Sequence, residues 1–137
     1  MSVSQTLQEL STALGDHYTR WRTLTLAEGE AIAAGQWQQV EDLEESKRQL
    51  QDLVRARQRE LRDECTRCGL NAVVVEEPFK SILHELIALE GRNDQALASQ
   101  RQRNLARQEE LQSATHTLRQ VREVYTSKRE AVWQSYS

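Results

Sequence analysis

The sequence predicts an all-α fold, in which an antiparallel helical hairpin and a long third helix form an elongated, coiled-coil-like bundle. The helix formers Gln, Glu, Arg, Leu and Ala dominate the composition. Apolar residues recur at steps of three and four along most of the chain, which is the spacing of one helical face. A single proline and five glycines leave few points at which a helix would break. We therefore expect one helical domain over residues 1–137 with three long helices.

The first helix is expected over about residues 3–34 and the second over about residues 37–68. Gly35 separates them, because a glycine just past a helix adopts the left-handed conformation that ends it. Trp37 then falls on the apolar face of the second helix, where we expect it to cover the end of the hairpin. The apolar face of the first helix comprises Val3, Leu7, Leu10, Leu14, Tyr18, Trp21, Leu24 and Ile32. That of the second comprises Trp37, Val40, Leu43, Leu50, Val54, Leu61, Cys65 and Cys68.

Residues 69–77 are expected to connect the second helix to the third. Gly69 is a helix stop, and the following sequence Leu-Asn-Ala-Val-Val-Val-Glu-Glu breaks the helical period. Its three consecutive valines predict an extended segment. Pro78 suits the first turn of the next helix, with Glu76 and Glu77 near its positive end.

The third helix is expected over about residues 78–135. At about 1.5 Å per residue it would be roughly 80–90 Å long, against roughly 45–50 Å for each of the first two. Either about half of it extends past the hairpin or it breaks near Gly91, and we expect a continuous helix. Its apolar seam becomes polar in the middle and apolar again towards the end, the polar positions being Asn93, Gln100, Asn104 and Arg107.

Charge and hydropathy exclude several classes of partner. The 18 basic and 21 acidic side chains are interspersed and give a net charge of −3, so no nucleic-acid partner is expected. No apolar run approaches the ~20 residues of a membrane span, so membrane insertion is not expected either. The first ten residues lack the pattern of a secretory signal, and we expect a cytoplasmic protein.

The pair Cys65 and Cys68 is the only motif with metal or redox spacing. It falls in the last turn before Gly69, where the helix dipole disfavours thiolates. A structural zinc site needs four ligands, which only a dimer would assemble from this pair. We expect the two thiols to pack as small apolar groups, and a zinc- or thiol-dependent regulator is an alternative.

No catalytic residue and no cofactor are expected. The sequence contains no glycine-rich phosphate loop, nucleophile elbow or zinc-protease motif. The histidines His17, His84 and His116 are far apart in sequence and lack metal-ligand spacing. The sequence therefore predicts a protein that is not an enzyme.

The last turns of the third helix are unusually apolar for a chain terminus. Terminal turns of small helical proteins tend to fray, so large apolar side chains there need an explanation. One explanation is packing against a second copy, and the other is a docking face for an amphipathic segment of a partner. The residues concerned are Val121, Val124, Tyr125, Val132, Trp133 and Tyr136.

Three stretches resemble flagellar type III export chaperones of the FlgN/FliT kind. One is the corner Glu-Ala-Ile-Ala-Ala-Gly-Gln-Trp and the helix after it, through Glu30, Gly35, Leu43, Lys47 and Leu50. Another is a Leu-x-x-x-Asn-x-x-x-Leu stretch formed by Leu89, Asn93 and Leu97. The last is a tyrosine near the C-terminus, matched by Tyr125.

The resemblance implies a cytoplasmic, non-catalytic chaperone. Its partners would be the C-terminal helical segments of hook-associated or filament-cap proteins, and the export gate or export ATPase that receives them. The motif-matching residues would include Asn93, Leu97 and Trp37. The partner-binding residues would be Leu111, Leu118, Val121, Val124, Tyr125, Val132 and Trp133. The alternative is a structural coiled coil that self-associates through the third helix, as a homodimer or a higher oligomer.

Overall fold

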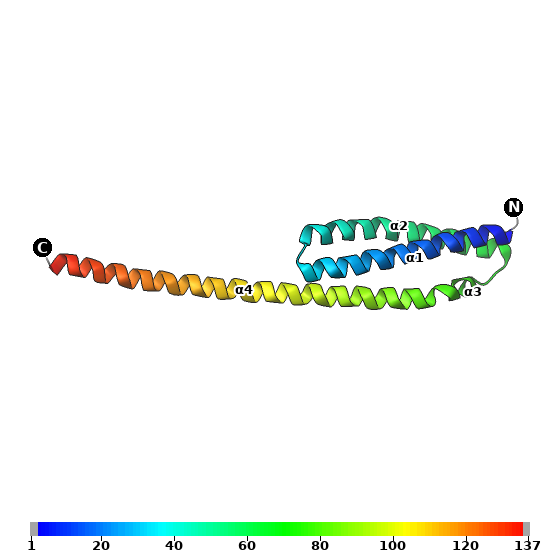
Figure 1. Ribbon diagram of the computed structural model, residues 1–137. Coiled ribbons are helices and arrows are strands. Elements are labelled where there is room, and N and C mark those ends of the chain that lie inside the picture. The colour runs from blue at the N-terminus through cyan, green and yellow to red at the C-terminus, as the bar shows by residue number, and fades with distance from the viewer. Residues whose placement is uncertain (1–2, 136–137) are drawn as a thin grey trace. The chain divides into compact units, whose positions relative to one another are not determined.

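The computed structural model describes residues 3–135, and these are helical almost throughout. The element order is α1 (Val3–Ala34), α2 (Trp37–Cys68), α3 (Ala72–Glu76), the 3₁₀ turn η1 (Glu77–Phe79) and α4 (Lys80–Ser135). The described residues contain no strand. The all-α fold with three long helices is confirmed (Figure 1). None of the helices in this range is long and apolar enough to cross a membrane.

By their internal contacts, the residues fall into two compact units, Met1–Leu97 and Ala98–Ser137. The first unit holds α1, α2, α3, η1 and the beginning of α4. The second holds the rest of α4.

Glycines end both helices of the hairpin. Gly35 and Gly69 have φ of +68° and +71°, the left-handed conformation that residues with a side chain adopt at a cost. After α1, the N–H of Gln36 donates to the carbonyl of Ala31 at 2.9 Å. After α2, the N–H of Leu70 donates in the same way to the carbonyl of Cys65 at 2.9 Å. These bonds satisfy carbonyls that the helix itself leaves unpaired, and at Gly35 they allow α1 and α2 to lie side by side (Figure 1).

Trp37 does not form the buried end of the hairpin that the sequence predicts for it, because the residue is 42% exposed and is not part of the apolar group at the corner. Smaller side chains close this end instead. Ala31, Ile32 and Val40 are buried there, and Leu43, Ala96 and Leu97 pack against them. We call this group the corner cluster.

The larger apolar group, which we call the main cluster, lies further from the corner. Tyr18 and Phe79 meet edge to face there, with ring centroids 5.4 Å apart. A leucine or valine buried in such a cluster contributes about 1.5–3 kcal/mol to folding. The buried members of the main cluster are Leu14, Tyr18, Val54, Leu61 and Leu86.

The expectation of an extended connection over residues 69–77 is also wrong, because a short helix, α3, forms there. The side-chain oxygen of Asn71 accepts a hydrogen bond from the backbone N–H of Val73 at 3.0 Å and so caps the helix. This turn brings Val75 against the main cluster and leaves Val73 and Val74 exposed. Helix capping therefore overrides the strand preference of three valines.

Helix α4 runs for 56 residues and passes through Gly91 without a break. A glycine inside a helix costs about 1 kcal/mol relative to alanine. Contacts on both sides of Gly91 offset this cost, since Glu90 and Asn93 are each held by residues of α1.

Candidate functional site

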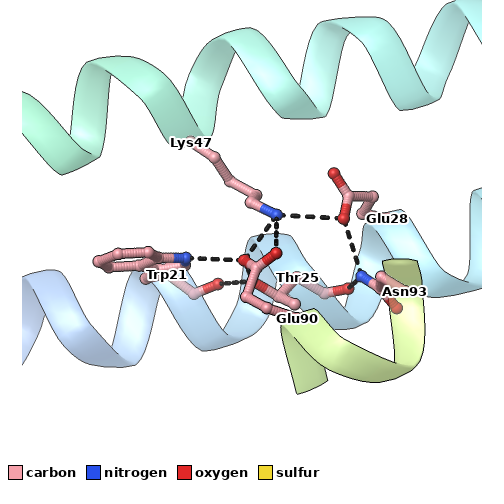
Figure 2. Close-up of polar contacts among 6 residues, drawn as sticks. All are labelled: Trp21, Thr25, Glu28, Lys47, Glu90 and Asn93. Carbon is pink, nitrogen blue, oxygen red and sulfur yellow. Dashed lines mark hydrogen bonds and ion pairs between the residues drawn. The ribbon is translucent and has the colours of Figure 1, made fainter. Parts of the chain in front are cut away.

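A layer of polar side chains separates the main cluster from the corner cluster within the first unit. Figure 2 shows its six members, which come from three helices and point toward one another. We call this group the polar layer. It consists of Trp21, Thr25 and Glu28 of α1, Lys47 of α2, and Glu90 and Asn93 of α4.

Lys47 is the centre of the layer and is almost fully buried, with 7% of its side chain exposed. Its ammonium lies 3.1 Å from Oε1 of Glu28 and 2.6 Å from Oε1 of Glu90. A second contact to Glu90, at Oε2, measures 2.9 Å. One cation from α2 thus joins a carboxylate of α1 to a carboxylate of α4.

Glu90 receives two further hydrogen bonds from α1. The indole N–H of Trp21 donates to Oε1 at 3.0 Å, and the hydroxyl of Thr25 lies 3.1 Å from the same oxygen. Burial on its own would raise the pKa of Glu90, but the donors Lys47, Trp21 and Thr25 and the charge of Lys47 outweigh it and lower the pKa. Glu90 therefore keeps its negative charge to lower pH than an ordinary glutamate.

Asn93 links the layer to the backbone of α1. Its amide nitrogen donates to the carbonyl of Thr25 at 2.9 Å and to Oε1 of Glu28 at 2.8 Å. Helix α1 approaches this amide closely at Gly29, where an added Cβ would lie only 2.8 Å from Oδ1 of Asn93. The position of Asn93 on α4 therefore requires a residue without a Cβ at position 29 of α1.

The buried polar atoms of the layer all have hydrogen-bond partners. Among the described residues, no buried side-chain nitrogen or oxygen lacks a hydrogen-bond partner. Because polar partners on three helices must meet at one level, any axial shift of α4 along the hairpin would leave buried charges unpaired. We infer that the layer fixes the register of α4 on α1 and α2.

The second candidate site lies on α4 between residues 98 and 135. Every side chain from residue 101 to residue 134 is exposed. Successive residues of an α-helix are rotated by about 100°, so residues seven apart lie within about 20° of each other. Leu111, Leu118, Tyr125 and Val132 follow this spacing and form one row, which Val121 and Trp133 flank. We call the set Leu111, Leu118, Val121, Tyr125, Val132 and Trp133 the α4 strip.

Val124 is the one described residue of the expected partner-binding set that lies off this face. It precedes Tyr125 by one residue and so points about 100° away. Leu105 also lies off the strip, roughly 140° from Leu118. Tyr136 lies outside the described residues.

The structure places the motif-matching residues in the first unit. Asn93 is buried in the polar layer, Leu97 packs against the corner cluster, and Trp37 is exposed beside the corner. Two of these residues therefore contribute to packing of α4 on the hairpin.

The cysteines are free, with Cys65 buried and Cys68 half-buried. Burial raises the pKa of both thiols, and the charge of the nearby Glu64 raises it further in each case. Both therefore favour the unreactive protonated form. Within residues 3–135, no group of three or more His, Cys, Asp or Glu side chains is placed to hold a metal ion.

Most of the polar layer was not predicted, although a pattern in the sequence marks it. Lys47 lies four residues after Leu43 and three before Leu50, which is an apolar-face position. Glu28 likewise fills the gap between Leu24 and Ile32. Charged residues at core-facing positions of two helices indicate a buried ion pair.

Comparison with known proteins gives no relative for this chain: no family model, curated protein or solved structure matches it.

Proposed function

We propose that this chain is a non-catalytic chaperone that binds amphipathic helical segments of other proteins through the α4 strip. The observation that supports this most is the exposure of the strip, whose six apolar side chains are 55–72% exposed along one face of a helix. An exposed apolar row of this kind is typical of an interaction site, and a helical strip suits a helical partner.

The client class follows from the resemblance to flagellar export chaperones. We propose that the clients are C-terminal helical segments of hook-associated or filament-cap proteins, which the chaperone would pass to the export gate or export ATPase in the cytoplasm. A segment that self-assembles through an apolar face would stay monomeric while the α4 strip covers that face.

The size of the strip favours a modest affinity. Full burial of each aliphatic side chain contributes about 1.5–3 kcal/mol, and association itself costs about 4–15 kcal/mol. We therefore expect a dissociation constant on the order of micromolar. Such an affinity suits a carrier that must release its client.

A second candidate function is self-association, and the heptad spacing of Leu111, Leu118, Tyr125 and Val132 favours it. A structural coiled coil of this kind would be a stable dimer at micromolar concentration. Its melting temperature would rise with protein concentration.

Calorimetric titration of the full chain with C-terminal segments of hook-associated and filament-cap proteins from the same organism distinguishes the two candidates. The chaperone function predicts saturable binding, one to one, of at least one segment. Absence of heat with every segment, from a protein that light scattering shows to be a tight dimer, would support the structural coiled coil instead.

A further inference from the structure

The charge of the chain is divided unevenly between its two units. Residues 98–135 carry seven basic and four acidic side chains, a net charge of +3. Because the whole chain has a net charge of −3, residues 1–97 carry −6. The segment that presents the α4 strip is therefore basic, in a protein that is acidic overall.

The basic charge lies on the same face as the strip. With Leu118 as the reference direction, four arginines fall within about 60° on either side. The four glutamates of the segment all lie more than about 60° away, Glu110 at the edge and Glu109 directly opposite. The arginines are Arg103, Arg107, Arg122 and Arg129.

These arginines have no acidic partner among residues 3–135. None of the four forms an ion pair with another described residue. Several arginines of the first unit do form ion pairs: Arg22 pairs with Glu85 at 2.8 Å and Arg62 pairs with Glu76 at 2.9 Å. The strip face thus presents apolar side chains together with unpaired guanidinium groups.

From this arrangement we infer that the α4 strip selects an amphipathic helix whose apolar face is bordered by carboxylates. The inference rests on the proposed function and names the chemistry of its client. An acidic border places Asp or Glu against Arg122 and Arg129, where each guanidinium binds a carboxylate with two hydrogen bonds. The same border speeds encounter by attraction to the basic segment.

Two other occupants fit this face less well. A second copy of the strip would place arginines against arginines, and such like-charge contacts oppose pairing. An anionic membrane surface would attract the segment, but insertion of the strip would carry Arg129, about 20° from Leu118, toward hydrocarbon. A helix whose apolar face is bordered by carboxylates avoids both the like-charge contacts and the burial of an arginine in hydrocarbon.

Three designed peptides test the inference on the full chain. All three have the same leucine heptads, and their bordering positions are Glu, Gln or Lys. We expect the Glu peptide to bind at least about tenfold more tightly than the Gln peptide in low salt, and the Lys peptide to bind most weakly. The Glu–Gln difference should shrink at high salt, because exposed charge pairs are screened.

A charge reversal tests whether the arginines of the strip face cause the selection among the peptides. The double variant Arg122→Glu with Arg129→Glu should reverse the order, so that the Lys peptide binds most tightly. The control double variant Arg101→Glu with Arg119→Glu makes the same change in net charge about 100° from Leu118, and it should keep the original order. A reversal in the control as well would overturn the inference, because net charge alone would then explain the selection.

The remaining outcomes separate the inference from the proposed function. Equal binding of the three peptides would overturn the inference and leave the proposed function in place. Binding of none of them, with binding to vesicles that contain phosphatidylserine but not to vesicles of phosphatidylcholine alone, would overturn both.

Discussion

The two parts of α4 use the same helix in opposite ways. Before residue 98 the helix buries polar groups, and Asn93 is 7% exposed within a satisfied network. After it, the helix exposes apolar groups, and Leu118 is 69% exposed. The difference shows that helix formation and tertiary packing are separable. Residues 80–97 hold the fold together, whereas residues 98–135 present a surface.

The largest effect is expected from Lys47→Ala. Removal of the ammonium leaves Glu28 and Glu90 without their cation in a buried setting, which should destabilise the chain by about 3–5 kcal/mol. Urea denaturation measures this change. Lys128→Ala is the matched control, since Lys128 is exposed and its loss should change stability by less than about 0.5 kcal/mol. Equal stability of the two variants would show that the polar layer does not hold α4 on the hairpin.

A smaller destabilisation is expected from Gly29→Ala. Alanine is the better helix former by about 1 kcal/mol, yet its Cβ would lie 2.8 Å from Oδ1 of Asn93. We expect a net loss of about 1–3 kcal/mol, because Asn93 cannot move without losing its bonds to α1. Gly91→Ala is the control and should stabilise by up to about 1 kcal/mol, since nothing lies within 4 Å of the added Cβ.

The destabilisation by Gly29→Ala should largely disappear in an Asn93→Ala background, where the clashing oxygen is absent. Thermal or urea unfolding of the unchanged chain, the two single variants and the double variant measures the coupling free energy between the two positions. An unchanged loss in that background would mean that the tight contact between α1 and α4 is not the cause.

A modest dependence of stability on pH is expected from Glu90. Its pKa is lower in the folded state than in the unfolded chain, so its contribution is present above the ordinary glutamate pKa. The contribution is lost as the pH falls through the lowered value. Glu90→Gln should therefore flatten the acid limb of a stability–pH curve measured by urea titration. A curve of unchanged slope would show that another carboxylate controls the acid response.

The sequence predicts much of the fold because its period is regular and its stops are glycines. Gly35 and Gly69 each end a helix through a positive φ, which no other residue in the described range adopts. The three valines of the connection misled the prediction, because Asn71 caps a short helix there. Local propensity carries no information on which capping bond forms.

The sequence predicts the α4 strip better than it predicts the polar layer. The α4 strip follows from apolar spacing alone, because it involves a single helix. The polar layer depends on three helices meeting at one level, and residues as distant as Thr25 and Asn93 share a hydrogen bond. Periodicity indicates that Lys47 faces inward, but it does not identify Glu28 and Glu90 as its partners.

We propose that α4 binds its partner through the strip face and not through exposed apolar residues in general. This proposal can be tested by titrating the Glu-bordered peptide against the unchanged full chain, the Leu118→Asp variant and the Leu105→Asp variant, with helicity followed by circular dichroism. Both leucines are exposed, at 69% and 59%, but Leu105 lies roughly 140° from the strip. We predict unchanged helicity in both variants, loss of binding in Leu118→Asp and near-normal binding in Leu105→Asp. Retained binding in Leu118→Asp, or equal loss in both variants, would contradict the claim.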